Sequence, residues 1–237
     1  MVPEARQTSR AARAAALTLW LAGAAARRRF DASALSSADR RRWARMVSVA
    51  HRAEWMSSRA LLVAHGPAPG EAWSLSHSGG FAALLTGPAR MRIGVDLERV
   101  KQRDFARLAG FGFDAREVAA LSSLPARAAL RNFYVMWTLK EAAAKALGIG
   151  LWQALRECVF VPGARGWVGR LPGRAAWRAW VYAPRRDLVL AVVCVGSGAR
   201  RARAPRCREW PANGRKASET VEHVRPPGLR RQVRTPR

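Results

Sequence analysis

Apolar residues follow two different spacings along this chain, and the changes between them divide most of it into predicted strands and helices. Short runs of alternating or continuous apolar positions predict strands, because successive side chains of a strand point to opposite faces. Longer runs with apolar positions three or four apart predict helices. The predicted strands are residues 16–22, 73–76, 81–86, 91–100, 156–161, 166–170, 175–182 and 188–195. The predicted helices are residues 37–63 with a break near Val49, 103–109, 114–122 and 125–147.

The predicted strand at residues 91–100 places two acidic side chains next to each other. Residues two positions apart share one face of a strand, so Asp96 and Glu98 point the same way. Val95 and Leu97 then point into a core. The alternative is a solvated pair of carboxylates, which is common at exposed strand ends.

The predicted helix at residues 125–147 adds a third carboxylate and an ammonium group. Trp137, Glu141 and Lys145 are spaced four apart and form one stripe. A second stripe suits packing against a sheet, and it consists of Phe133, Met136, Ala143 and Leu147. With the two acidic residues of the strand, Glu141 would suit Mg²⁺, which binds carboxylates and accepts phosphate oxygens. The alternative is that Glu141 and Lys145 form an ordinary surface ion pair.

Together the two motifs resemble the signature of the 4′-phosphopantetheinyl transferases. That pattern is [VI]-G-[VI]-D, an interval, and [FW]-x-x-K-E-[AS]-x-x-K. This chain has IGVD at 93–96 and WTLKEAAAK at 137–145, with forty residues between them. A third segment, WSLSHSGG at 73–80, looks like the S-x-S-H-S segment of the surfactin-synthetase-activating type of this family.

The resemblance implies an α+β fold of two similar lobes, a pseudo-dimer in which each lobe is a small antiparallel sheet packed with a long helix. Residues 1–90 would form the N-terminal lobe. Residues 91–198 would form the C-terminal lobe, with the metal and signature-helix motifs. The active site would lie in the cleft between the lobes. Because one chain supplies both halves of that site, we expect a monomer.

The activity that the resemblance implies is transfer of the 4′-phosphopantetheine group of coenzyme A to a serine of an apo acyl or peptidyl carrier protein, with adenosine 3′,5′-bisphosphate as the other product. Asp96, Glu98 and Glu141 would bind Mg²⁺. Glu141 would also take the proton of the attacking serine, and Lys145 would neutralise charge on the diphosphate. The residues expected to bind the coenzyme are Ser76, His77, Ser78, Asp96, Lys140 and Lys145.

The chain departs from this family in the first lobe. Nine residues, 64–72, separate the apolar run that ends at Val63 from Trp73. Members of the surfactin-synthetase-activating type have a longer segment there, with a lysine that contacts the coenzyme phosphates. Arg59 or the arginines between 40 and 52 could supply that charge. A non-catalytic relative that binds the coenzyme or the carrier is therefore an alternative.

The chain is strongly basic, with 42 Lys or Arg against 16 Asp or Glu and a net charge of +26. Such a surface attracts an anionic coenzyme and an acidic carrier protein, and it also attracts nucleic acid. A basic nucleic-acid-binding protein is the second alternative. It would have no need of Asp96, Glu98 and Glu141 together, so nucleic acid is not the expected partner.

The remaining sequence features bear on location. No apolar run is long enough to span a membrane, and Cys158, Cys194 and Cys207 form no metal or disulfide pattern, so we expect a cytoplasmic protein. The apolar run 14–26 resembles part of a secretory signal, but it also suits a first strand. Residues 199–237 hold twelve Lys or Arg and no apolar period, and they are predicted to be a basic disordered tail.

Overall fold

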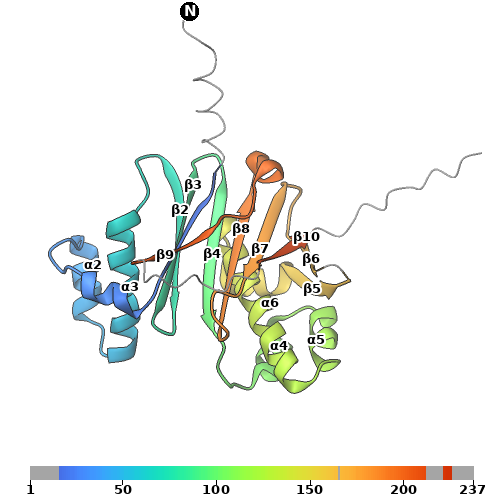
Figure 1. The fold of residues 1–237 in the computed structure, drawn as a ribbon. Coiled ribbons are helices and arrows are strands. Elements are labelled where there is room, and N and C mark those ends of the chain that lie inside the picture. The colour runs from blue at the N-terminus through green and yellow to red at the C-terminus, as the bar shows by residue number, and fades with distance from the viewer. Residues whose placement is uncertain (1–15, 165, 212–220, 226–237) are drawn as a thin grey trace, which may run out of the picture.

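The strands of the protein form two sheets with helices packed against them. The computed structural model describes residues 16–164, 166–211 and 221–225. One sheet has four strands and the other six, and most neighbouring strands are antiparallel (Figure 1). The predicted α+β class is confirmed, whereas the pseudo-dimeric relation between two lobes stays a prediction.

The four-stranded sheet has the strand order β2-β3-β1-β9. Its strands are β1 (Thr18–Ala22), β2 (Glu71–Ser78), β3 (Phe81–Pro88) and β9 (Cys207–Trp210). Helix α3 (Val49–His65) packs against it through Leu61, which is fully buried with Leu84 of β3. The chain between β1 and α3 holds η1 (Ala24–Arg29) and α2 (Ser37–Ala44).

The six-stranded sheet has the strand order β4-β8-β7-β10-β6-β5. Its strands are β4 (Arg92–Arg99), β5 (Val159–Gly163), β6 (Gly166–Arg170), β7 (Trp177–Tyr182), β8 (Leu188–Val195) and β10 (Val221–Arg225). The helices of this half are α4 (Phe105–Gly112), α5 (Ala115–Ser122), α6 (Ala126–Leu147), α7 (Leu151–Glu157) and η2 (Ser197–Arg201).

The two faces of the six-stranded sheet belong to different cores. On one face, Leu139 of α6 is fully buried in the core that α6 forms with the sheet. The predicted sheet-facing stripe is wrong for Phe133, whose ring instead stacks on Phe113 at the end of α4. The opposite face carries Val95 and Trp180, which lie in one cluster with residues of β1 and β3. Among the described residues, no helix combines the length and the apolar character needed to cross a lipid bilayer.

The periodicity located the long elements well. The break predicted near Val49 is confirmed, because α2 ends at Ala44 and α3 begins at Val49. The helix predicted at 125–147 corresponds to α6, which stops at Gly148 in the left-handed conformation. The short helix α7 was not predicted, because its apolar pattern is too short to separate it from the strand predicted at 156–161.

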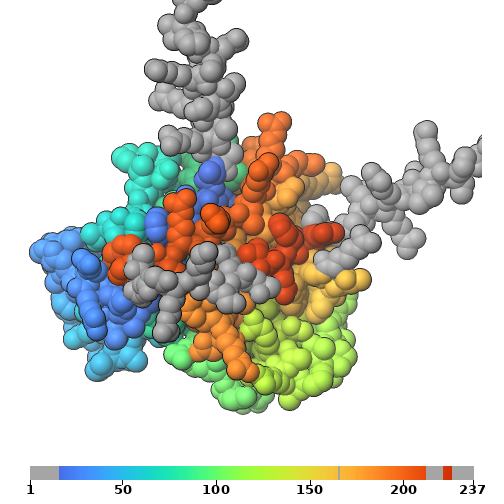
Figure 2. All heavy atoms as spheres, viewed as in Figure 1, coloured from blue at the N-terminus to red at the C-terminus, as the bar shows by residue number. Residues whose placement is uncertain are grey.

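The prediction of a disordered tail from residue 199 is wrong for the part of that segment that the structure describes. Strand β9 pairs in parallel with β1, and β10 lies between β7 and β6. Figure 2 shows the orange and red atoms of these C-terminal segments against the body of the protein. The prediction failed because these strands are stabilised by distant parts of the chain. β9 adds an edge strand next to β1, and β10 lies between β7 and β6, whereas the sequence of each strand has no apolar period that would indicate it. The rest of the predicted tail, 212–220 and 226–237, lies outside the described residues.

Candidate active site

The two sheets meet along β2 and β4, and serine side chains join them there. Alternate residues of β2 are Ser74, Ser76 and Ser78, which we call the serine seam. Each hydroxyl oxygen accepts a backbone N–H of β4, so side chains replace the main-chain ladder between these strands. The donor and acceptor pairs are Val95 with Ser74 at 3.0 Å, Leu97 with Ser76 at 3.2 Å and Arg99 with Ser78 at 3.2 Å.

The same hydroxyls hold the acidic residues of β4. Ser76 Oγ donates to Asp96 Oδ1 at 2.8 Å, and Ser78 Oγ donates to Glu98 Oε2 at 2.9 Å. Asp96 and Glu98 therefore point to one side of the strand, as predicted. Because each hydroxyl has a single proton, both serines already use theirs on a carboxylate. Their position supports the acidic pair, whereas their predicted contact with the coenzyme stays untested.

A glycine brings α6 close enough to β4 to add its own charges. A Cβ atom on Gly94 would lie 2.0 Å from the backbone oxygen of Ala142 and 2.8 Å from the nitrogen of Ala146. Both distances are below any van der Waals contact, so this approach requires glycine. The strand motif and the helix motif are therefore packed backbone to backbone.

Lys145 connects the two motifs directly. Its Nζ donates to Asp96 Oδ1 at 2.8 Å and to the backbone oxygen of Val95 at 2.9 Å. The Asp96 side chain is almost completely buried, and a third of the Lys145 side chain is exposed. The sequence therefore predicted correctly that these two segments, nearly fifty residues apart, come together.

Glu141 lies in the electrostatic field of the same acidic pair. Burial first, and then the charge of Asp96, raise the pKa of Glu141 to about 7. Lys145 and a hydrogen bond with Trp137 act in the opposite direction. Burial and the charge of Asp96 also raise the pKa of Glu98. Asp96 is thus close enough to Glu98 and Glu141 to disfavour the ionisation of both.

These carboxylates fit a divalent cation in part. Asp96 Oδ2 is buried and has no hydrogen-bond partner among the described residues, so this oxygen can bind a cation. The other oxygen is shared by Ser76 and Lys145. Within the ranges that the structure describes, no three His, Cys, Asp or Glu side chains are grouped in a way that could hold a metal ion as they stand. The donor chemistry suits Mg²⁺, and binding would require Glu98 or Glu141 to turn toward Asp96.

His77 lies on the other face of β2. The alternation of the strand turns it away from the serine seam and toward α3, where its Nδ1 is 3.7 Å from Glu54 Oε2. The His51 ring is also near, with a centroid separation of 5.8 Å. Burial lowers the pKa of His77, and Glu54 opposes that change. The structure therefore separates His77 from Ser76 and Ser78, although they are adjacent in sequence.

The coenzyme contact predicted for Lys140 is contradicted by its burial. Its ammonium group is fully buried and forms an ion pair with Glu117, with 2.8 Å between Nζ and Oε2. It also donates to the backbone oxygens of Leu155 and Cys158. Lys140 points to the side of α6 opposite Lys145 and fixes α5 and α7 to the helix. Its neighbour in sequence, Glu141, faces the acidic pair.

Sequence reasoning missed two residues that shape the site. Ser74 continues the period-two serine pattern of β2, so that pattern could have identified it. Glu117 holds Lys140 and accepts the backbone N–H groups of Asp114 and Phe160. No sequence spacing connects α5 with α6 in this way, so Glu117 could not have been paired from sequence.

Comparison with known proteins agrees with the motifs. A sequence model of the 4′-phosphopantetheinyl transferase superfamily matches residues 92–193. The 4′-phosphopantetheinyl transferase pptA of Paxillus involutus is 37% identical over a region that covers 34% of this chain and 39% of that protein. The 4′-phosphopantetheinyl transferase HetI of Nostoc sp. strain PCC 7120 is 33% identical over 53% of this chain and 52% of that protein.

The matched regions thus span about half or less of these relatives. The region matched by the family model includes β4, α6 and the contact between Asp96 and Lys145. The family model thus relates residues 92–193 of this chain to the 4′-phosphopantetheinyl transferase superfamily, and the two relatives agree with it.

Proposed function

We propose that this chain transfers the 4′-phosphopantetheine group of coenzyme A to a serine of an apo acyl or peptidyl carrier protein. The carrier oxygen would form a new bond to phosphorus, and the diphosphate bond of the coenzyme would break to release adenosine 3′,5′-bisphosphate. The observation that carries this proposal is the contact of Lys145 with Asp96, which joins both signature motifs in one site beside Glu141.

Glu141 has the properties of a general base. Its pKa of about 7 lets it accept a proton near neutral pH, and that proton would come from the carrier serine. The neighbouring Trp137 hydrogen bond holds the carboxylate in place. Because α6 is packed against β4 at Gly94, the distance between Glu141 and the acidic pair is set by the backbone.

Lys145 supplies positive charge where the leaving group develops negative charge. Its Nζ donates to the backbone oxygen of Val95, and a third of the side chain is exposed, so the ammonium group can also contact a ligand. A fixed cation that faces a developing oxyanion lowers the barrier of phosphoryl chemistry. Asp96 keeps that ammonium in position.

Asp96, Glu98 and Glu141 would hold Mg²⁺, which would supply Lewis-acid stabilisation of the diphosphate oxygens when bound. The buried and unpartnered Asp96 Oδ2 is the feature of this site that favours a cation. On the other face of β2, His77 and the half-buried Arg59 are candidates for coenzyme contacts. Since one chain provides all of these groups, we propose that it acts as a monomer.

The proposal is tested by incubating the protein with an apo carrier protein, coenzyme A and Mg²⁺ and measuring the intact mass of the carrier. We expect the carrier to gain one phosphopantetheine group, and we expect the gain to disappear with a chelator or in Glu141→Gln. Glu157→Gln, which changes a carboxylate on α7 hydrogen-bonded to Gln153, is the matched control and should keep full activity.

Two results would contradict the proposal. The first is binding of the coenzyme or carrier with no mass gain by any carrier tested, which would indicate a non-catalytic relative. The second is modification that continues at an unchanged rate in Glu141→Gln.

A further inference from the structure

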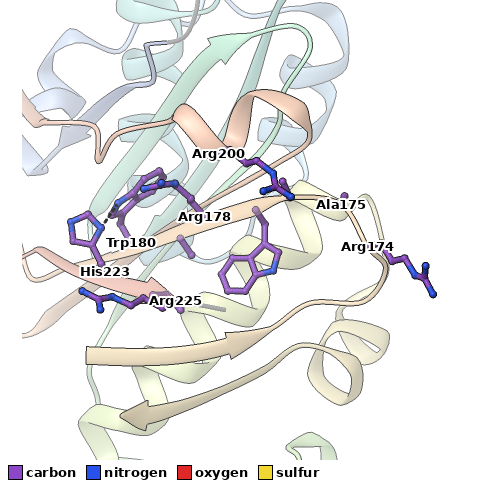
Figure 3. A pocket seen from close by; sticks show the side chains of 11 residues that line it. Arg174, Ala175, Arg178, Trp180, Arg200, His223 and Arg225 are labelled. Atoms are coloured by element: carbon purple, nitrogen blue, oxygen red, sulfur yellow. Dashed lines mark hydrogen bonds between the residues drawn. The ribbon is translucent and has the colours of Figure 1, made fainter. Parts of the chain in front are cut away.

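A second concave surface lies away from the candidate active site and is lined by arginines. It encloses about 810 Å³ between β7, β10, η2 and the turn before β7. Figure 3 shows Arg178 and Arg225 beside the Trp180–His223 pair, Arg200 farther along near Ala175, and Arg174 at the far end. We call this surface the arginine pocket, and its charged lining residues are Arg174, Arg178, Arg200 and Arg225.

The arginine pocket is separate from the serine seam. Trp180 belongs to the core on the face of the six-stranded sheet where Val95 points. Asp96 is the next residue of β4 and points to the opposite face, toward α6. Two strands, β8 and β7, also lie between β4 and β10. A ligand in this pocket would therefore not occupy the site proposed for transfer.

The guanidinium groups of the pocket have no acidic partner among the residues that the structure describes. None of the four arginines forms an ion pair with a carboxylate in these ranges. No Asp or Glu occurs among the described residues that line the pocket. The nearby acidic residue Glu222 instead accepts a hydrogen bond from Trp167 at 2.8 Å. Several like charges around one cavity repel each other, and an anionic ligand would relieve that repulsion.

The hydrogen bond between Trp180 and His223 orients one more donor toward the pocket. Trp180 is fully buried, and its Nε1–H donates to His223 Nδ1 at 3.0 Å. Because Nδ1 accepts this bond, the proton of the neutral imidazole lies on Nε2. His223 lines the pocket and is exposed, and no hydrogen bond from its Nε2 to another described residue is found, so Nε2–H can donate to a ligand there.

The elements that carry these groups are fixed in place. The N–H of Gly196 donates to Ala176 O at 2.8 Å, which ties the start of η2 to the segment before β7. Ala199 buries η2 in the core, so the adjacent Arg200 is held over the pocket. Strand β10 pairs with β7 so that His223 lies opposite Trp180. The pocket is therefore formed before any ligand binds.

We propose that the arginine pocket binds a small ligand with two or more phosphate groups. Arginine pairs with phosphate through two parallel hydrogen bonds, and several arginines around one cavity match several phosphates. The volume is that of a small-molecule site, not of an extended groove for a polymer. Residues 226–237 contain no Asp or Glu, so that segment of the chain does not complement this charge. This inference does not depend on the proposed transferase activity.

The test is calorimetric titration of the full chain with tripolyphosphate at physiological ionic strength, with a chelator present. We expect one ligand to bind per chain. Arg178→Gln/Arg225→Gln should weaken binding by about tenfold or more, because it removes two of the charged donors. The matched control is Arg107→Gln/Arg156→Gln, which removes the same charge from exposed positions on α4 and α7 and should change affinity by less than about twofold.

Further arms distinguish the pocket from other anion-binding surfaces. Lys145→Ala should leave tripolyphosphate affinity unchanged, and a loss would place binding at the candidate active site and overturn the proposal. Equal weakening in both double variants would show diffuse attraction by the basic surface, which also overturns it. The proposal is also overturned if a single-stranded oligonucleotide binds through Arg178 and Arg225 and tripolyphosphate does not bind. All variants change exposed side chains, and circular dichroism checks that they fold.

Discussion

Lys140→Met removes the charge at the centre of the most deeply buried polar network of the site. The three N–H donors of Lys140 are all in use, on Glu117 at 2.8 Å, on the oxygen of Leu155 at 2.6 Å and on the oxygen of Cys158. Methionine has a similar length but no donor. The variant therefore leaves two backbone oxygens without a partner and Glu117 without its cation.

The cost follows from the burial of that pair. Both side chains are fully buried, and burial lowers the pKa of Lys140 and raises that of Glu117, so each charge depends on the other. Breaking a buried ion pair from one side costs about 3–5 kcal/mol. Since domains are stable by about 5–15 kcal/mol, this is a large fraction of the total. The melting temperature should fall by roughly 6–20 °C for a chain of this size.

The assay is thermal and urea unfolding followed by far-ultraviolet circular dichroism. Lys101→Met is the control, because Lys101 is exposed and should contribute less than about 0.5 kcal/mol. Lys140→Met/Glu117→Gln should recover part of the loss, because the remaining carboxylate charge is removed. If Lys140→Met unfolds like the unchanged protein but has a higher KM for coenzyme A, the ammonium contacts the ligand and our account of the network is wrong.

Three further predictions concern the seam and the helix that meets it. Gly94→Ala should lower the free energy of unfolding by about 4 kcal/mol or more, because its Cβ would lie 2.0 Å from a backbone oxygen of α6. Urea unfolding measures this, with Gly150→Ala as the control because space around Gly150 is open; a loss below about 1 kcal/mol in Gly94→Ala would contradict the close approach. Ser76→Ala should cost about 1–3 kcal/mol and lower transferase activity, because Asp96 loses a donor and a buried N–H loses its acceptor; unchanged activity would show that the serine does not orient the carboxylate. Without divalent metal, stability should fall as pH rises from about 4.5 to about 7, since the folded pKa of Glu141 exceeds the unfolded one. Glu141→Gln should remove about 3 kcal/mol of this pH dependence, measured by urea unfolding at a series of pH values, and an identical slope in both proteins would refute it.

The sequence was most informative where the geometry of a single strand or helix determines which side chains share a face. The alternation around Asp96 and Glu98 predicts their shared face, and the four-residue interval between Glu141 and Lys145 predicts theirs. The structure confirms the first through the serine seam. It confirms the meeting of the motifs through the contact of Lys145 with Asp96.

Sequence reasoning failed where two distant elements decide the environment. Lys140 is charged and adjacent to Glu141 in sequence, so it was assigned to the same site. No residue of α6 indicates that Glu117 of α5 lies on the buried side of the helix and pairs with Lys140. His77 shares a motif with two serines but lies across the strand from them, because adjacent residues of a strand face opposite sides. Strand β9 is short and polar, and its pairing with β1 closes a loop of nearly two hundred residues. No local pattern contains that information.

The spacing of the serine seam restricts how the two sheets can slide past each other. A slip by one residue, roughly 3.4 Å, would turn every hydroxyl of β2 away from β4. A slip by two residues, roughly 6.8 Å, would preserve most of these bonds and would present Ser76 to Glu98 in place of Asp96. This second slip would carry Ser78 past the end of β4 at Arg99, so its bond to the Arg99 N–H would be lost. The junction thus has discrete positions, and the three serine bonds favour the observed one.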